Sequence, residues 1–554
     1  IAGAPAAAAA VAAAAERERE EEEERSSDSR PRREGRREKR MLASAAGSVQ
    51  SRESLDMEAR QRNAKALVYK TCVFCSLTSM LLGYDVGIMA AALPNMVSDL
   101  HLNTVQEEVI AGSLNIVAGL CAVLAGYTAD KKGRRIALGI ACVVFCAGAA
   151  LMTSAMGFTA LFIGRIITGV GVGFGLVIAP LYLSEVVPPE RRGFLVCLFD
   201  VVLNIGILNG YIIGYLVQAN VEGAGLRWRI MIAIAIVPPV MIIIGLFYLE
   251  ESPRWLIAVG RNDEAKRVLD IMIPDPDKAQ EVGDEIRAAV IAETSNSYQD
   301  VLCPATTGLK AALHISLGLA IAQQITGSEA VVYYTPEIMK QAGITGESEQ
   351  LLWALPVGMA KLAGELVSVP LLDTQGRRPM LLIGGSMQTV SLLLLGLSFS
   401  LEWGFTATLI CVCSFMFFFE VAAPISWLMP SEVYSTGKRG KAQSLAVTVN
   451  RIVSGTIAIS FLSLSKLLTV AGTFYLFCGL AFFTTIWYWA VIPETKGMTL
   501  EEVSAILDTG GMKGIAGSAE DQTYDAVRKH GDLKTNHHNG EPAFIGEDDH
   551  GLSA

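Results

Sequence analysis

The stretch GYTADKKGRR, residues 126–135, separates two apolar runs, and a related turn, DTQGRR, follows another apolar run at residues 373–378. The two turns are 243 residues apart, counted from Gly133 to Gly376. A second set repeats at a separation of 247 residues: Glu185, Arg192 and Gly193 recur as Glu432, Arg439 and Gly440. A membrane protein made of two related halves is the simplest source of both repeats, since each half then carries the same loop at the same membrane face. The duplication therefore predicts a transporter.

The composition argues against an ordinary soluble enzyme. Of the 554 residues, 51% are hydrophobic and 18% are charged, whereas soluble domains carry about 25% charged residues. The formal net charge of −10 comes mostly from the two tails and a central polar loop, so it indicates no nucleic-acid partner. No nucleophile constellation stands out, and GVGVGFG, residues 169–175, lies in an apolar span without a preceding strand, where helix packing explains it better than phosphate binding. The sequence therefore predicts neither an enzyme nor a cofactor.

The apolar stretches predict the fold, because a helix needs about 20 apolar residues to cross the hydrocarbon layer. Twelve stretches qualify, at 69–92, 107–127, 136–156, 159–183, 195–218, 230–249, 311–335, 351–372, 379–400, 405–430, 443–466 and 472–492. We therefore expect an all-α membrane protein with twelve transmembrane helices in two pseudo-symmetric six-helix halves, joined by a cytosolic helical loop. The expected domains are a disordered tail at 1–66, a first bundle at 67–250, a linker at 251–309, a second bundle at 310–500 and a disordered tail at 501–554.

The basic residues predict the orientation. Short loops on one side carry most of the lysines and arginines, including those of both GRR turns, and such loops face the cytoplasm. Both termini and the central loop are then cytosolic, and the plasma membrane is favoured over a vacuolar or organelle membrane. The acidic run Glu20–Glu24 argues against an organelle transit peptide. The cysteines are scattered through apolar spans, and the Cys72/Cys75 pair has no nearby histidine or second pair, so no metal site is expected.

Ionisable residues within the spans form a short list of candidate functional groups. They are Asp85, Arg165, Asp200, Glu329, Lys361, Glu365, Glu420 and Arg451. Each costs about 2.5–3.5 kcal/mol at mid-membrane on insertion scales, so a partner or a wet cavity is expected. If Asp85 and Arg165 are neighbours, protonation of the carboxylate releases the pair, which would serve as a proton-coupling switch. A static structural ion pair explains the two residues equally well.

A second group of polar residues predicts a substrate site. Asp200 and Asn204 share a helix face, and Gln323, Gln324 and Glu329 surround Gly327, which permits a bend or a close approach to a ligand. Carboxylates and carboxamides bind adjacent hydroxyls, and aromatic faces flank them. The remaining candidates are Tyr333, Tyr334, Lys361, Trp427 and Asn450. Such a lining suits a neutral polyhydroxylated solute, while the alternative for any one residue is interhelical hydrogen bonding that only holds the bundle together.

Two choices stay open at this point. Lys361 has Glu329, Asp200 or Glu365 as possible partners, and Asn450 is either a cavity residue or a packing residue. The loop residues form opposite-charge sets whose inter-helix salt bridges would hold a cytoplasmic gate shut, since anchoring by arginine alone does not explain the repeated acids. The predicted gate residues are Asp130, Arg134, Arg135, Glu185, Arg192, Asp373, Arg377, Arg378, Glu432 and Arg439.

Several motifs together resemble the sugar porter family of the major facilitator superfamily. They are GYTADKKGRR, PLYLSEVVPPERRG at 180–193, ESPRWL at 251–256, QQITG at 323–327, the second GRR and PETKG at 493–497. Stretches such as LLGYDVGIM, AGSLNI and VNRIVSG are similar to plant-type polyol and monosaccharide proton symporters. The resemblance implies that Asp85 is the proton-coupling acid with Arg165 as its partner. It also implies that Gln323, Gln324, Glu329, Trp427 and Asn450 contact sugar.

The chain departs from the family pattern at two of these positions. Many sugar porters have Gln where this chain has Asp200 and Asn where it has Glu329, and the polyol-type members usually have Glu and then Asp. The repeat, the polar residues within the spans and the resemblance together predict proton-coupled symport of a polyol or a monosaccharide by alternating access. We expect the protein to be a monomer in the lipid bilayer. The alternatives are a proton-independent uniporter, which a protonophore would leave unaffected, and a transporter-like solute sensor.

Overall fold

A computed structural model describes residues 57–187, 192–293, 298–434 and 436–498, with residues 19, 55, 502–503 and 506–507 in addition. The side chains of residues 192–197, 292–293, 298, 373 and 436–437 are outside this description. Nearly all of the two tails predicted at 1–66 and 501–554 lies outside the described residues.

The chain separates into two compact units. The first comprises residues 1–67 and 269–281, and the second comprises residues 68–268 and 282–554. The first unit contains the beginning of helix Met57–Leu100 and parts of α9 (Asn262–Met272) and α10 (Pro276–Glu293). Everything below concerns the second unit. The expected division into bundles at 67–250 and 310–500 with a linker at 251–309 stays a prediction. The two compact units do not divide the chain at these boundaries.

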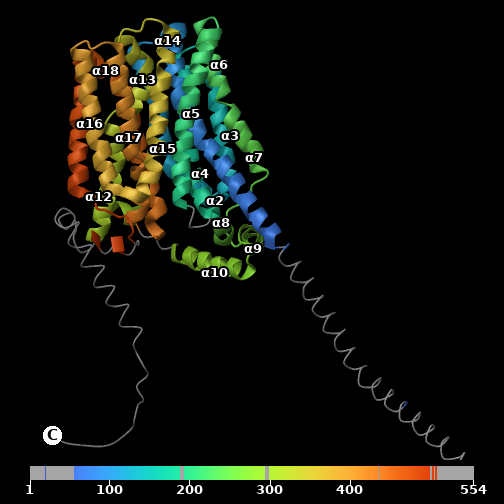
Figure 1. Cartoon of the computed structure of the whole chain (residues 1–554). Coiled ribbons are helices and arrows are strands. Elements are labelled where there is room, and N and C mark those ends of the chain that lie inside the picture. Colours follow the sequence, from blue (N-terminus) through green and yellow to red (C-terminus); the bar gives the residue numbers. More distant parts are fainter. Residues whose placement is uncertain are drawn as a thin grey trace, which may run out of the picture. The chain divides into compact units, whose positions relative to one another are not determined.

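The helices of the second unit follow one another in two series (Figure 1). The first series, here called the N-half, contains residues 68–100 of helix Met57–Leu100, α2 (Thr104–Lys132), α3 (Arg134–Thr153), α4 (Phe158–Val186), α5 (Arg192–Asn220), α6 (Ala224–Ile234) and α7 (Val237–Leu246). The second series, the C-half, contains α12 (Thr307–Ile325), α13 (Ser328–Gln341), α14 (Glu347–Leu352), α15 (Ala354–Gln375), α16 (Arg377–Ser400), α17 (Phe405–Val433) and α18 (Thr436–Val491). Between them lie α8 (Pro253–Ala258), α9, α10 and α11 (Tyr298–Leu302).

The helices account for all twelve predicted spans. Among the described residues, ten helices are long and apolar enough to cross a membrane. The last of them, within α18, is two helices that meet at Thr469, where φ is 69°. A further span is made by α12 and α13, which join at Gly327 with a φ of 87°. The described part of the chain contains helices, turns, bends and short irregular segments but no strand, and the predicted all-α fold is confirmed.

The repeated GRR turns have the same local structure in both halves. Gly133 and Gly376 adopt φ values of 92° and 95°, which L side chains rarely adopt. A Cβ atom would lie 2.4 Å from Glu251 Oε2 at Gly133 and 2.6 Å from Glu494 Oε2 at Gly376. Glycine is therefore required at each turn both by the backbone angle and by the carboxylate that packs on it.

The two ends of the second unit are distinguished by short helices. In Figure 1, α14 lies at one end and α8 at the opposite end. We call these the α14 end and the α8 end. The first GRR turn belongs to the α8 end, since Trp255 of α8 donates its indole N–H to the carbonyl of Asp130 at 2.8 Å. The second turn follows α15, which begins beside α14 and runs away from the α14 end.

Candidate functional site

Asp85 and Arg165 form a buried ion pair within the N-half. Arg165 Nη1 lies 2.8 Å and 2.7 Å from the two carboxylate oxygens of Asp85, and the two side chains are 0% and 4% exposed. Arg165 also donates from Nε to the carbonyl of Ile110 on α2 at 3.0 Å. The carboxylate thus holds a guanidinium that is tied to two other helices, and loss of its charge would release that arginine from helix Met57–Leu100.

A hydrogen-bond network links α12 to α18 in the C-half. Asn450 donates from Nδ2 to Gln323 Oε1 at 2.7 Å, and its Oδ1 accepts from Gln324 Nε2 at 3.3 Å. Arg451 donates to the same Oδ1 at 2.7 Å. Gln323 also donates to the carbonyl of Ala423 on α17 at 3.2 Å. Three predicted site residues from two separate helices therefore meet, and all of them are buried.

The network continues across the boundary between the halves. Asn115 of α2 donates to Tyr333 Oη at 3.2 Å and to Glu329 Oε1 at 3.4 Å, both on α13. Arg451 Nη1 lies 3.8 Å from the same oxygen of Glu329. The guanidinium of Arg451 also lies 6.0 Å from the ring centroid of Trp427. Glu329 and Tyr333 of α13 thus lie where the N-half and the C-half touch.

Lys361 has a partner outside the three that the sequence left open. Its ammonium group forms an ion pair with Glu420 of α17, and both side chains are buried. The charges of Lys361 and Arg451 also act on Asp200 of α5, and Glu329 and Glu365 act on Lys361. Helix packing decided this choice, because α15 packs against α17. A cluster of charged residues therefore extends from the half-buried Asp200 of α5 to the buried Lys361–Glu420 pair of the C-half.

Several buried oxygen acceptors of the site have no hydrogen-bond partner among the described residues. They are Asn115 Oδ1, Asn204 Oδ1 and Gln324 Oε1. Buried polar atoms nearly always have a hydrogen-bond partner, so we expect these oxygens to accept hydrogen bonds from donors outside the chain. Hydroxyl groups are such donors, and each of them also accepts a hydrogen bond. The arrangement is chemically suited to a solute with several hydroxyls.

The predicted gate residues form ion pairs inside each half. Arg134 donates to Glu185 at 2.8 Å from both Nε and Nη2, and to Asp130 at 3.2 Å. Arg377 makes the equivalent contact with Glu432 at 2.7 Å and 3.1 Å. These pairs join helices of one half rather than the two halves, so they brace each bundle at the α8 end.

The remaining gate predictions differ in how far the structure describes them. The backbone N–H of Arg135 donates to Glu251 at 3.2 Å, and Arg378 donates to the carbonyl of Trp489 at 2.8 Å. The side chain of Arg439 is half-buried and interacts with another group of the protein. The side chains of Arg192 and Asp373 lie outside the described residues.

Contacts between the halves concentrate at the α14 end. Glu108 of α2 accepts from the backbone N–H of Ser463 at 2.5 Å and from its hydroxyl at 2.6 Å. Lys466 donates to Thr104 at 2.5 Å, and Gln218 of α5 donates to Glu347 of α14 at 2.7 Å. The two halves are therefore closed on each other at this end.

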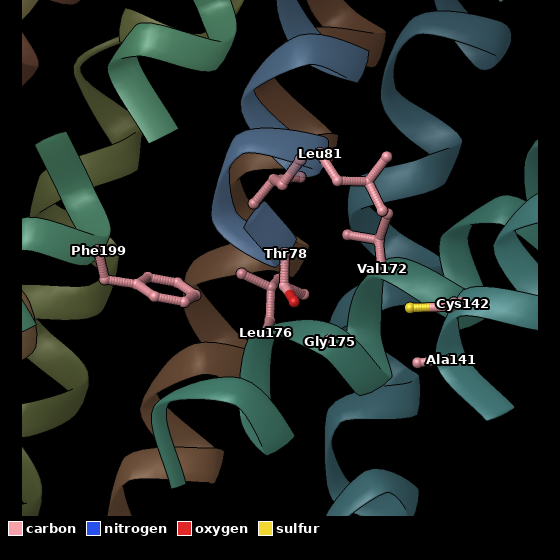
Figure 2. A pocket seen from close by; sticks show the side chains of 10 residues that line it. Thr78, Leu81, Ala141, Cys142, Val172, Gly175, Leu176 and Phe199 are labelled. Atoms are coloured by element: carbon pink, nitrogen blue, oxygen red, sulfur yellow. The ribbon is translucent and has the colours of Figure 1, made fainter. Parts of the chain in front are cut away.

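A pocket within the N-half contains no predicted site residue (Figure 2). Its lining is mainly apolar and includes Leu81, Val172, Leu176 and Phe199. The hydroxyl of Thr78 donates to the carbonyl of Phe74 at 3.4 Å. This pocket offers none of the acceptors that the polar network provides, and we assign no solute to it.

Sequence reasoning missed some residues that the structure brings into the site. Asn115 lies in the AGSLNI stretch but was not chosen as a site residue, and Glu420 appeared only in the list of ionisable residues within spans. Glu251 and Glu494, which cap the GRR turns, are themselves 243 residues apart. This 243-residue repeat is present in the sequence and would have identified both glutamates as partners of the GRR turns.

Comparison with known proteins gives a family for the chain. The family model described as sugar (and other) transporter matches residues 71–507. "Probable polyol transporter 4" of Arabidopsis thaliana is 37% identical over 493 residues, covering 87% of this chain and 92% of the relative. "Polyol transporter 5" of the same plant is 36% identical over 463 residues, covering 79% and 86%.

A solved structure supports the fold independently. The major facilitator superfamily proton:xylose symporter XylE of E. coli, bound to 6-bromo-6-deoxy-D-glucose, superposes with a TM-score of 0.70 at 23% identity, covering 80% of this chain and 99% of XylE. At this identity the likeness shows the major facilitator fold. The family matches also agree with the expectation of a multi-pass membrane transporter rather than an enzyme. The chain belongs to the sugar (and other) transporter family, and its fold is the major facilitator fold.

Proposed function

We propose that the protein moves a polyol or a monosaccharide together with protons across a membrane by alternating access. The observation that carries this proposal is a polar network, in which Asn115 of the N-half contacts Glu329 and Tyr333 of the C-half. Arg451 connects Glu329 to Asn450. Unpaired acceptors accompany it. A solute with several hydroxyl groups supplies the missing donors and replaces contacts between the halves with contacts of its own. Relatives named polyol transporters and a fold neighbour named a proton:xylose symporter support the same solute class.

The substrate residues that we propose lie in and beside this network. They are Asp200, Asn204, Gln323, Gln324, Glu329, Tyr333, Lys361, Trp427 and Asn450. The amides hold the solute through hydrogen bonds, and Trp427 offers an apolar face beside Arg451. The acids Asp200 and Glu329 are acceptors that favour a solute rich in hydroxyl donors.

Asp85 and Arg165 supply the proton coupling in this proposal. The ionised carboxylate holds Arg165, and protonation removes the charge that attracts the guanidinium. Because Arg165 also contacts the Ile110 carbonyl of α2, its release changes how helix Met57–Leu100 packs on α2 and α4. The proton thereby changes the balance between conformations that the solute also selects.

Further parts of the proposal concern membrane and orientation. We place the α8 end, with its GRR turns, in the cytoplasm, because basic residues in short loops gather there. The α14 end is then the outer face, and it is closed in this structure. We propose a monomer in the plasma membrane.

The test is uptake by the purified protein in liposomes, with sorbitol, mannitol, inositol, glucose and xylose screened with and without an imposed pH gradient. Uphill accumulation of one of these solutes that a protonophore abolishes is the expected result. Uptake that a protonophore leaves unchanged would favour the uniporter, and solute binding without any uptake would favour the sensor.

A further inference from the structure

Glu365 of α15 is a buried acid that the proposed proton pair does not use. Its side chain is fully buried, at 0% exposure. In the part of the chain that the structure describes, neither of its carboxyl oxygens has a hydrogen-bond partner. An ionised carboxylate is very unfavourable in an apolar interior without donors, and the protonated form avoids most of that cost. The geometry therefore favours a neutral Glu365 in this conformation.

The charged groups around Glu365 leave it without an ion-pair partner among the described residues. Lys361 precedes it by one helical turn, but the ammonium group of that lysine is paired with Glu420 of α17. Asp200 of α5 acts on Glu365 as a like charge, and Lys361 acts on it as an opposite charge. The other charged groups of this cluster are Glu329 of α13 and Arg451 of α18, which act on Lys361. Among the described residues no cation forms an ion pair with Glu365, because the Lys361 ammonium group lies against Glu420.

The position of Glu365 links its ionisation to movement of the halves. On one side, α15 packs against α5 of the N-half, where a Cβ at Gly358 would lie 3.0 Å from Tyr211. On the other side, α15 packs tightly against α17, and Ser368 donates to the carbonyl of Val421 at 3.0 Å. Separation of the halves would therefore part α15 from α5 while α15 stays with α17. That movement admits water to Glu365, and contact with water favours the ionised carboxylate.

We propose that Glu365 carries a second proton through the transport cycle, an inference that rests on the proposed function. When the site is open on the uptake side, the Glu365 carboxylate takes up one proton from water. The neutral carboxyl is then buried as the halves close. When the site opens on the opposite side, the O–H bond breaks and the same proton passes to water, which leaves the carboxylate for the return step. Together with Asp85, this moves two protons for each solute molecule.

The experiment compares the wild-type protein with Glu365→Gln in liposomes, using sorbitol as the solute. Glutamine has the shape of the protonated carboxyl and carries no charge, so folding and closure should be retained. The measurement is the sorbitol gradient that an imposed proton gradient just balances, which gives the number of protons per solute. We expect two protons for the wild type and one for Glu365→Gln. Glu402→Gln, at an exposed glutamate between α16 and α17, is the matched control and should keep two.

A second measurement does not depend on solute identity or on transport. Infrared difference spectra of the purified, solute-free proteins should show a protonated carboxyl band that is present in the wild type and in Glu402→Gln. The band should be missing from both Glu365→Gln and Glu365→Met. If the spectra of wild type and Glu365 variants agree in this region, Glu365 is not protonated and the inference is wrong.

The outcomes separate this inference from the proposed function. If the wild type moves sorbitol without protons, the proposed function fails and the second proton fails with it. If the wild type couples transport to protons and Glu365→Gln has the same stoichiometry, only the inference about Glu365 fails.

Discussion

Glu251 accepts the backbone N–H of Arg134 at 2.9 Å and so caps the first turn of α3. The same carboxylate accepts from the N–H of Arg135. In the C-half, Glu494 accepts the N–H of Arg377 at 3.0 Å and the N–H of Arg378 at 3.0 Å. A negative charge at a helix N-terminus is stabilising, because free N–H groups and the helix dipole both face it. The duplicated sequence thus builds the same cap twice.

The capping predicts a loss of stability when either acid is removed. Glu251→Ala or Glu494→Ala should cost about 1 kcal/mol of unfolding free energy, as the loss of a helix cap does. Thermal unfolding of the purified protein in detergent measures the effect. Glu264→Ala, which removes an exposed glutamate paired with Arg261, is the control and should change little. Equal unfolding temperatures for all three variants would contradict the capping role.

The Glu251 cap should also depend on pH. Burial raises the pKa of the Glu251 carboxyl above its usual 4.5, although the N–H donors that it accepts lower the pKa. The folded protein therefore holds this proton more tightly than the unfolded chain does, and the resulting stabilisation is lost as the pH rises through the raised pKa. Glu251→Gln removes the titration. The difference in unfolding temperature between wild type and Glu251→Gln should consequently change between acidic and neutral pH, and a constant difference would oppose this assignment.

Replacement of Asp85 tests the proton pair. Asp85→Asn keeps a polar side chain beside Arg165 but removes the charge that holds the guanidinium at 2.7 Å. We expect accumulation of solute against a gradient to be abolished, while exchange of labelled for unlabelled solute across the liposome membrane survives. Uphill uptake at the wild-type level in Asp85→Asn would contradict the assignment of Asp85 as the proton-coupling acid.

Asn450 is the centre of the C-half network and should control solute affinity. Asn450→Ala removes the bonds to Gln323 and Gln324 and one acceptor of Arg451. Lost hydrogen bonds of buried groups cost about 1–3 kcal/mol, so the KM for uptake should rise roughly tenfold or more. Glu402→Gln provides the control for expression and insertion. An unchanged KM would show that Asn450 only packs the helices.

The closed α14 end should open when its buried acid is removed. Glu108→Ala eliminates both hydrogen bonds to Ser463, and the closed state should lose about 1–3 kcal/mol. Spin labels at Val105 of α2 and Leu467 of α18, which are 64% and 78% exposed, report the separation of the halves. We expect a larger population of long distances in Glu108→Ala than in the otherwise unchanged labelled protein. Identical distance distributions would mean that Glu108 does not hold this end closed.

The helices could be predicted from the sequence because crossing a bilayer imposes a length and an apolar composition that each segment meets alone. The break at Gly327 was also foreseen, since only glycine readily takes the required φ. The GRR turns were recognised through their repeat, although their capping partners, Glu251 and Glu494, were not. Their carboxylates come from segments 117 residues beyond the arginines whose N–H groups they accept.

The sequence by itself determined that charged residues within the spans need partners, because an isolated charge is unfavourable in lipid and in an apolar core. It did not determine which partners they have. Lys361 had three candidates, yet it pairs with Glu420 because α15 packs against α17. Glu365, one turn further along the same helix, is left without a hydrogen-bond partner among the described residues. Such choices depend on the rotation and contact of whole helices, and only the tertiary structure decided them.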